Sequence, residues 1–185
     1  MKLNIATLLT ISRIAFIPLI AILFILHDEK YRDASAYIFL LALITDYLDG
    51  YIARNFNQTT AFGAFLDPIA DKLLVVITIF LLAGSLDSII FILSSLIIIS
   101  REFLVIAIRQ RLAELKNNVS LNVNNLGKIK TGFQMSALFA LLHSNIEFTY
   151  INLHTLGLLL LFIAAVLTVI SFFYYVRNTW DDILG

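Results

Sequence analysis

The sequence predicts an all-α, polytopic integral membrane protein with six transmembrane helices and both termini in the cytoplasm. Of its 185 residues, 60% are hydrophobic and only 14% are charged, with a mean hydropathy of +0.91, which is far from the composition of a soluble globular domain. Six apolar segments approach or exceed the roughly 20 residues that cross a bilayer. The basic residues fall mostly in alternate loops, as the positive-inside rule requires.

The six segments are joined by short polar stretches, so residues 1–185 are predicted to form a single domain. The segments cover residues 5–26, 34–56, 62–83, 88–112, 127–145 and 153–176. The first is followed by HDEKYRD with no small-x-small cleavage site, so we interpret it as a retained span and not as a signal peptide. Eleven of the 13 basic residues then lie on the cytoplasmic side, namely Lys2, Arg13, Arg54, Lys72, Arg101, Arg109, Arg111, Lys116, Lys128, Lys130 and Arg177.

The composition excludes cysteine chemistry and gives no support for nucleic-acid binding. The chain has no cysteine, which excludes disulfides, thiolate metal ligands and cysteine nucleophiles. Its 13 basic and 13 acidic residues balance, which gives no indication of nucleic-acid binding.

The first segment carries a polar stripe, because Asn4, Thr7, Thr10 and Arg13 recur at every third residue. Such a stripe indicates a helix that lies in the membrane interface or faces a polar cavity. Only about 20 Å of apolar helix follows Arg13, shorter than the roughly 30 Å hydrocarbon layer, so Arg13 is predicted at the cytoplasmic shoulder of the membrane. An arginine that snorkels to the surface is the alternative. Asn4, Thr7 and Arg13 are therefore candidate site residues.

The second and third segments carry four carboxylates in the stretch DYLDGYIARNFNQTTAFGAFLDPIAD, residues 46–71. Asp46 and Asp49 are i,i+3 and Asp67 and Asp71 are i,i+4, so each pair shares a helix face. A short polar loop joins the two antiparallel helices, which brings the pairs to similar depth. Four carboxylates in a low dielectric repel one another unless a cation neutralises them. Oxygen ligands suit Mg²⁺, Mn²⁺ or Ca²⁺, and four acids suit two ions better than one.

Structural roles explain only part of this stretch. Helix N-capping could account for Asp67, and a salt bridge to Arg54 could account for Asp49, but neither explains all four acids. Three small residues beside the acids permit either close helix packing or the close approach of a ligand, and both readings stay open. These residues are Gly50, Ala53 and Gly63.

The fourth and fifth segments supply basic residues suited to an anion. Arg101 interrupts an apolar run within SREF, and an intramembrane arginine indicates function. Glu102 is expected to point elsewhere on the helix and not to neutralise Arg101. In GKIKTG, Lys128 and Lys130 at a helix start oppose the helix dipole, an arrangement that favours a docked anion. With Thr131 these residues form a candidate acceptor-phosphate pocket, and ordinary membrane-surface lysines are the alternative.

Oxygen-ligated cations beside a basic pocket indicate phosphoryl-type transfer, since divalent ions bridge a diphosphate and a nearby carboxylate can accept a proton. The acidic stretch also resembles a known signature, that of the CDP-alcohol phosphotransferase family. The matching pattern is Asp46-x2-Asp49-Gly50-x2-Ala53-Arg54-x8-Gly63-x3-Asp67-x3-Asp71. The resemblance implies a membrane enzyme with six transmembrane helices, often dimeric, that transfers a phospho-alcohol from a CDP-linked donor to an acceptor hydroxyl and releases CMP.

The resemblance also implies roles for residues. The four aspartates would hold two Mg²⁺ or Mn²⁺ ions, and Asp71 would also be the general base. The cytidine nucleotide would be bound by Asp49, Gly50, Ala53, Arg54 and Gly63. Within the family the chain is most similar to bacterial members that use CDP-diacylglycerol as donor and glycerol 3-phosphate as acceptor, on the features NIATLLTISR, SREF and GKIKTG. The acceptor phosphate would then contact Arg101, Lys128 and Lys130, in a homodimer of the bacterial inner membrane whose site faces the cytoplasm among membrane lipids.

Three alternatives remain open at the level of sequence. One is another family member, such as a cardiolipin, phosphatidylinositol phosphate or phosphatidylserine synthase. A second is an intramembrane prenyltransferase, although its acidic motifs lie on well-separated helices. The third is a divalent-cation transporter, which would need a polar path that the apolar runs 34–44 and 73–82 do not offer.

Overall fold

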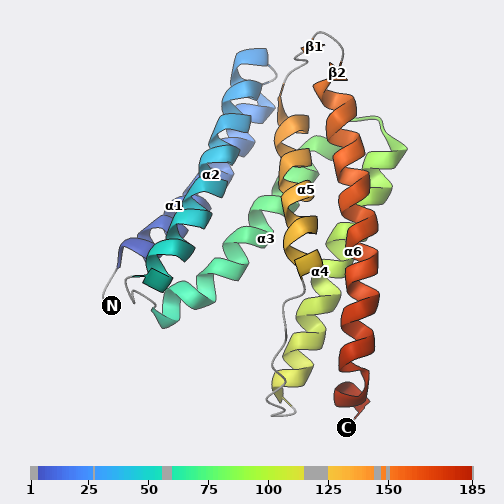
Figure 1. Cartoon of the computed structure of the whole chain (residues 1–185). Coiled ribbons are helices and arrows are strands. Elements are labelled where there is room, and N and C mark those ends of the chain that lie inside the picture. Colours follow the sequence, from blue (N-terminus) through green and yellow to red (C-terminus); the bar gives the residue numbers. More distant parts are fainter. Residues whose placement is uncertain are drawn as a thin grey trace. The chain divides into compact units, whose positions relative to one another are not determined.

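The computed structural model of the chain confirms the all-α class (Figure 1). It describes residues 4–26, 28–55, 60–114, 125–143, 147–148 and 151–184. The helices are α1 (Ile5–Ile25), α2 (Glu29–Asn55), α3 (Ala61–Ala83), α4 (Ile89–Glu114), α5 (Asn125–Leu142) and α6 (Leu153–Leu184). Between α5 and α6, β1 (Glu147–Phe148) pairs antiparallel with β2 (Ile151–Asn152). Strands of two residues are too short for a periodic signal, which explains why the sequence did not predict them.

Two helices extend by several residues beyond their predicted apolar segments, α2 at its start and α6 at its end. α2 begins at Glu29 because the side chain of Asp28 accepts a hydrogen bond from the backbone N–H of Lys30 at 3.0 Å, which caps the helix. Glu29 in the first turn also interacts favourably with the helix dipole. α6 continues to Leu184 because no proline or glycine interrupts it beyond residue 157.

Four helices in the described part of the chain are long and apolar enough to cross a membrane. Their candidate spans are Thr7–Ile25, Glu29–Ile52, Ile89–Leu112 and Leu153–Trp180. The other two long helices, α3 and α5, also carry charges, which are Asp67, Asp71 and Lys72 in α3 and Lys128 and Lys130 in α5. The structure therefore agrees with a membrane protein.

The chain divides into two compact units, each formed by two segments. Unit 1 contains residues Met1–Leu86 and Leu138–His154. In it, α1 packs against both α2 and α3. Fully buried apolar side chains from the three helices form its core, among them Ile20, Phe39 and Leu74. This packing positions the polar stripe of α1 beside the acidic stretch.

Unit 2 contains residues Asp87–Ala137 and Thr155–Gly185. Its core includes the buried side chains of Phe91 and Ile98 on α4 and Leu161 on α6. Large apolar side chains such as Phe173 remain exposed, as expected for a surface that faces lipid rather than water. The single domain predicted for residues 1–185 stays a prediction.

Candidate metal and substrate site

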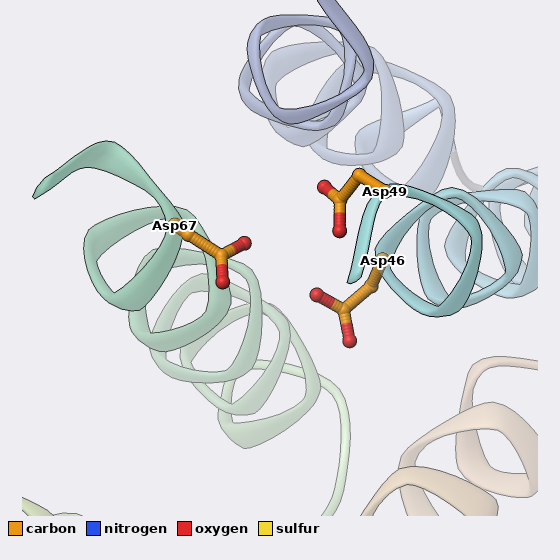
Figure 2. Close-up of side chains that lie close together, drawn as sticks. All are labelled: Asp46, Asp49 and Asp67. Carbon is orange, nitrogen blue, oxygen red and sulfur yellow. The ribbon is translucent and has the colours of Figure 1, made fainter. Parts of the chain in front are cut away.

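Four aspartates of unit 1 converge as the sequence predicted, and together they are called the acid cluster (Asp46, Asp49, Asp67 and Asp71). Figure 2 shows the carboxylates of Asp46 and Asp49 on α2 and of Asp67 on α3 pointing toward one another. One oxygen from each of these three lies within 4.8 Å of the others. The side chain of Asp49 is buried, whereas those of Asp46, Asp67 and Asp71 are 40–45% exposed.

The guanidinium of Arg13 on α1 binds all four acids. Its Nη2 lies 2.8 Å from Asp46 Oδ1 and 2.6 Å from Asp49 Oδ2. Its Nη1 lies 3.0 Å from Asp67 Oδ1 and 2.8 Å from Asp71 Oδ1. Each terminal nitrogen of the planar guanidinium thus binds the two acids of one helix, Nη2 those of α2 and Nη1 those of α3. The side chain of Arg13 is 0% exposed, so the alternative of a snorkelling arginine is wrong.

The polar stripe of α1 faces the acid cluster. Thr10, one turn before Arg13, donates a hydrogen bond from its hydroxyl to Asp49 Oδ2 at 3.1 Å. Thr7, Thr10 and Arg13 are all buried, while Asn4 precedes the first turn of α1 as its N-cap residue. The stripe therefore lines a polar site inside unit 1.

Close packing at the start of α3 joins that helix to α1. Thr60 caps α3, because its Oγ1 accepts a hydrogen bond from the backbone N–H of Gly63 at 3.0 Å. The Thr7 and Thr60 hydroxyls are 2.8 Å apart and hydrogen-bonded. A Cβ at Gly63 would lie only 2.9 Å from Thr60 Oγ1 and 3.1 Å from Thr7 Oγ1. Gly63 therefore makes room for this contact, and Asp67 is not the cap of α3.

The donor set of the acid cluster fits a hard divalent cation. Carboxylate oxygens from two helices are the ligands that Mg²⁺ and Mn²⁺ prefer. Asp49 pairs with Arg13, and the predicted alternative partner Arg54 lies on α2 with its side chain outside the described residues. The same holds for the side chain of Ala53, whereas Gly50 lies one residue after Asp49 on the same helix.

A second charged cluster lies in unit 2 and is called the Glu102 cluster (Arg101, Glu102, Lys130 and Ser171). Glu102 Oε1 lies 3.0 Å from Arg101 Nη1 and 2.7 Å from Lys130 Nζ. Arg101 Nη2 also donates to Ser171 Oγ at 3.2 Å. The expectation that Glu102 points away from Arg101 is wrong, because helical spacing constrains Cβ directions and the long arginine side chain folds back to its neighbour.

Two other residues predicted for the acceptor pocket lie apart from this contact. Lys130 is buried, but Lys128 is exposed on α5. The hydroxyl of Thr131 donates to the backbone carbonyl of Gly127 at 2.9 Å, within its own helix. The structure thus brings together Arg101 and Lys130 from the predicted set.

Thr60, which caps α3 beside the acid cluster, and Glu102 and Ser171 of the Glu102 cluster were not among the predicted site residues. Thr60 had a recognisable signal, since a threonine three residues before Gly63 fits the N-cap spacing. Glu102 and Ser171 had weaker signals, a carboxylate beside an intramembrane arginine and a lone hydroxyl in an apolar helix. Their partners come from helices distant in the sequence, which local patterns do not specify.

Comparison with known proteins gives consistent results over nearly the whole chain. The family model described as CDP-alcohol phosphatidyltransferase matches residues 3–176. A protein of Wigglesworthia glossinidia brevipalpis is 41% identical over 183 residues, which cover 99% of this chain and 98% of that protein. A protein of Salmonella choleraesuis is 42% identical over 185 residues, covering 100% and 99%. Both relatives are named CDP-diacylglycerol--glycerol-3-phosphate 3-phosphatidyltransferase.

Proposed function

Because the chain belongs to the CDP-alcohol phosphatidyltransferase family, we propose that it transfers the phosphatidyl group of CDP-diacylglycerol to glycerol 3-phosphate. The acceptor hydroxyl attacks the lipid-bearing phosphorus, the bond from that phosphorus to the CMP oxygen breaks, and phosphatidylglycerophosphate and CMP are formed. The relatives named for this reaction match along their full length, which supports the choice of acceptor over inositol phosphate, serine or phosphatidylglycerol.

The convergence of the four acids of the acid cluster is the observation that carries this proposal. In it, the cluster holds two Mg²⁺ or Mn²⁺ ions, which when bound neutralise charge on the diphosphate and on the oxygens that attack and leave. Asp71 accepts the proton of the acceptor hydroxyl. Its carboxylate is 42% exposed, which supports access for a substrate. The cytidine nucleotide lies against α2 and the start of α3, where it meets Asp49, Gly50, Ala53, Arg54 and Gly63.

The acceptor phosphate is bound in this proposal by Arg101 and Lys130. Their shared contact with Glu102 supports the role, because a carboxylate and a phosphate are both oxyanions that take charge-assisted hydrogen bonds. Lys128 and Thr131, exposed on the same helix α5, contribute charge and a hydroxyl at its edge.

Six membrane spans with cytoplasmic termini complete the proposal. Four of the spans correspond to the long apolar helices, and α3 and α5 supply the remaining two. The distribution of basic residues supports a site open to the cytoplasm at the bacterial inner membrane. A homodimer is proposed from the resemblance to the family alone.

An acceptor panel with one labelled donor tests this function. Purified full-length protein is incubated with CDP-diacylglycerol and Mg²⁺ or Mn²⁺, and CMP release is measured with glycerol 3-phosphate, glycerol, inositol phosphate, serine or phosphatidylglycerol. We expect release with glycerol 3-phosphate only, and none after chelation of the metal. Release with another acceptor alone would assign a different family activity, and no release with any alcohol would remove the transferase proposal.

A further inference from the structure

We propose that the guanidinium of Arg13 is an internal counter-cation that competes with divalent cations for the acid cluster. Arg13 is in this role a positioning residue: it holds the four carboxylates together and must leave their oxygens when a metal ion binds. The inference rests on the proposed function in one respect, that the acid cluster binds divalent cations.

The guanidinium of Arg13 lies among the carboxylates that would bind a divalent cation. Its two terminal nitrogens approach four carboxylate oxygens at 2.6–3.0 Å. Mg²⁺ requires carboxylate oxygens at about 2.0–2.1 Å and in a near-octahedral arrangement. The carboxylates of Asp46, Asp49 and Asp67, whose oxygens lie within 4.8 Å of one another, are all bound by Arg13, and a guanidinium and a divalent ion on the same carboxylates repel each other. Binding of the metal therefore requires Arg13 to move.

The charges determine the direction of the exchange. One guanidinium brings a single positive charge to four negative ones, so a doubly charged ion gains more from the same oxygens. The same reasoning gives Arg13 its structural role, because four carboxylates without a cation repel one another and separate α2 from α3. Arg13 thus lowers the affinity for metal and raises the stability of the protein before metal binds.

Arg13 is also incompletely satisfied in its buried position. Among the described residues, its buried Nε has no hydrogen-bond partner. An unpaired buried donor lowers the stability of the conformation that contains it, which favours release of the Arg13 side chain when a divalent cation binds. Thr10 still holds Asp49 through its hydroxyl, so one carboxylate keeps its position during the exchange.

Mn²⁺ binding to full-length variants tests this inference without measuring activity. The variants are Arg13→Gln, which removes the charge, Arg13→Lys, which keeps the charge but loses the fork, and Arg111→Gln as a control at an exposed arginine of α4. Free Mn²⁺ is followed by electron paramagnetic resonance, and thermal unfolding is recorded with and without saturating Mn²⁺. Arg13→Lys keeps the test available if Arg13→Gln does not fold before metal is added.

For Arg13→Gln we expect Mn²⁺ to bind at least about tenfold more tightly, which corresponds to about 1.4 kcal/mol. Its Tm without metal should fall, and the rise in Tm with Mn²⁺ should exceed that of the wild type. Arg13→Lys should lie between the two, and Arg111→Gln should match the wild type. Unchanged or weaker Mn²⁺ binding by both Arg13 variants would overturn the competition while leaving the proposed function intact. Absence of Mn²⁺ binding by the wild type would overturn both.

Discussion

Replacement of Gly63 by alanine tests the packing that brings the polar stripe of α1 to the acid cluster. The added Cβ would lie 2.9 Å from Thr60 Oγ1 and 3.1 Å from Thr7 Oγ1. Rotation of Thr60 about χ1 relieves the closer contact and removes both hydrogen bonds of Thr60. These are the cap bond from the backbone N–H of Gly63 at 3.0 Å and the bond to Thr7 at 2.8 Å.

The magnitude follows from these contacts. Loss of the cap costs about 1 kcal/mol, and loss of a neutral hydrogen bond costs about 1 kcal/mol more. Alanine in place of glycine in a helix returns about 1 kcal/mol. The free energy of unfolding of Gly63→Ala should therefore fall by about 1 kcal/mol, which for a chain of this size lowers Tm by roughly 2–4 °C.

The matched control is Gly127→Ala on α5, where a Cβ would meet no atom within 4 Å. This variant gains only helix propensity and should raise Tm by roughly 2–4 °C. Thermal unfolding of both purified proteins in the same detergent supplies the measurement. If the two glycine variants shift Tm by the same amount and in the same direction, the hydroxyl contact at Gly63 does not constrain α1 and α3.

Three further results are expected. Asp71→Asn should reduce CMP release by at least about 10²-fold, since it removes the proposed proton acceptor, while its donor binding stays close to that of the wild type. The control Asp87→Asn, at an exposed aspartate, should release CMP at the wild-type rate, and a near-normal rate of Asp71→Asn would remove Asp71 from that role. Lys130→Ala should raise the KM for glycerol 3-phosphate about tenfold or more, since a charged hydrogen bond contributes about 1.5–3 kcal/mol. Lys128→Ala, at an exposed lysine, should raise this KM less. Equal increases in the KM for glycerol 3-phosphate and for CDP-diacylglycerol would indicate that Lys130 has only a structural role. Glu102→Gln removes the carboxylate that Arg101 and Lys130 share. Addition of glycerol 3-phosphate should therefore raise the Tm of Glu102→Gln by more than it raises the Tm of the wild type. An equal rise would contradict the proposed contact of both residues with the phosphate.

Local patterns in the sequence were sufficient for the helices and for the convergence of the acid cluster. The i,i+3 and i,i+4 spacings set the faces of Asp46, Asp49, Asp67 and Asp71, and the short loop between α2 and α3 brought those faces together. The periodic stripe that ends in Arg13 also indicated a polar environment, but it left open whether that environment was a cavity or the membrane surface.

Contacts between distant segments were beyond these patterns. Whether Arg13 reaches four acids depends on how α1 packs against both α2 and α3, and no local feature encodes that packing. Glu102 was misjudged for a related reason, because the reach of the Arg101 and Lys130 side chains, not helix periodicity, determines which groups meet at its carboxylate.

Binding of Mn²⁺ to the purified full-length protein tests most directly whether the acid cluster holds the divalent cations that transfer requires. Wild type and the exposed-site control Asp87→Asn are expected to bind about two ions per chain. Asp49→Asn and Asp67→Asn remove ligands from the two helices and should each lose high-affinity binding. Undiminished Mn²⁺ binding by both of these variants would contradict a metal site in the acid cluster.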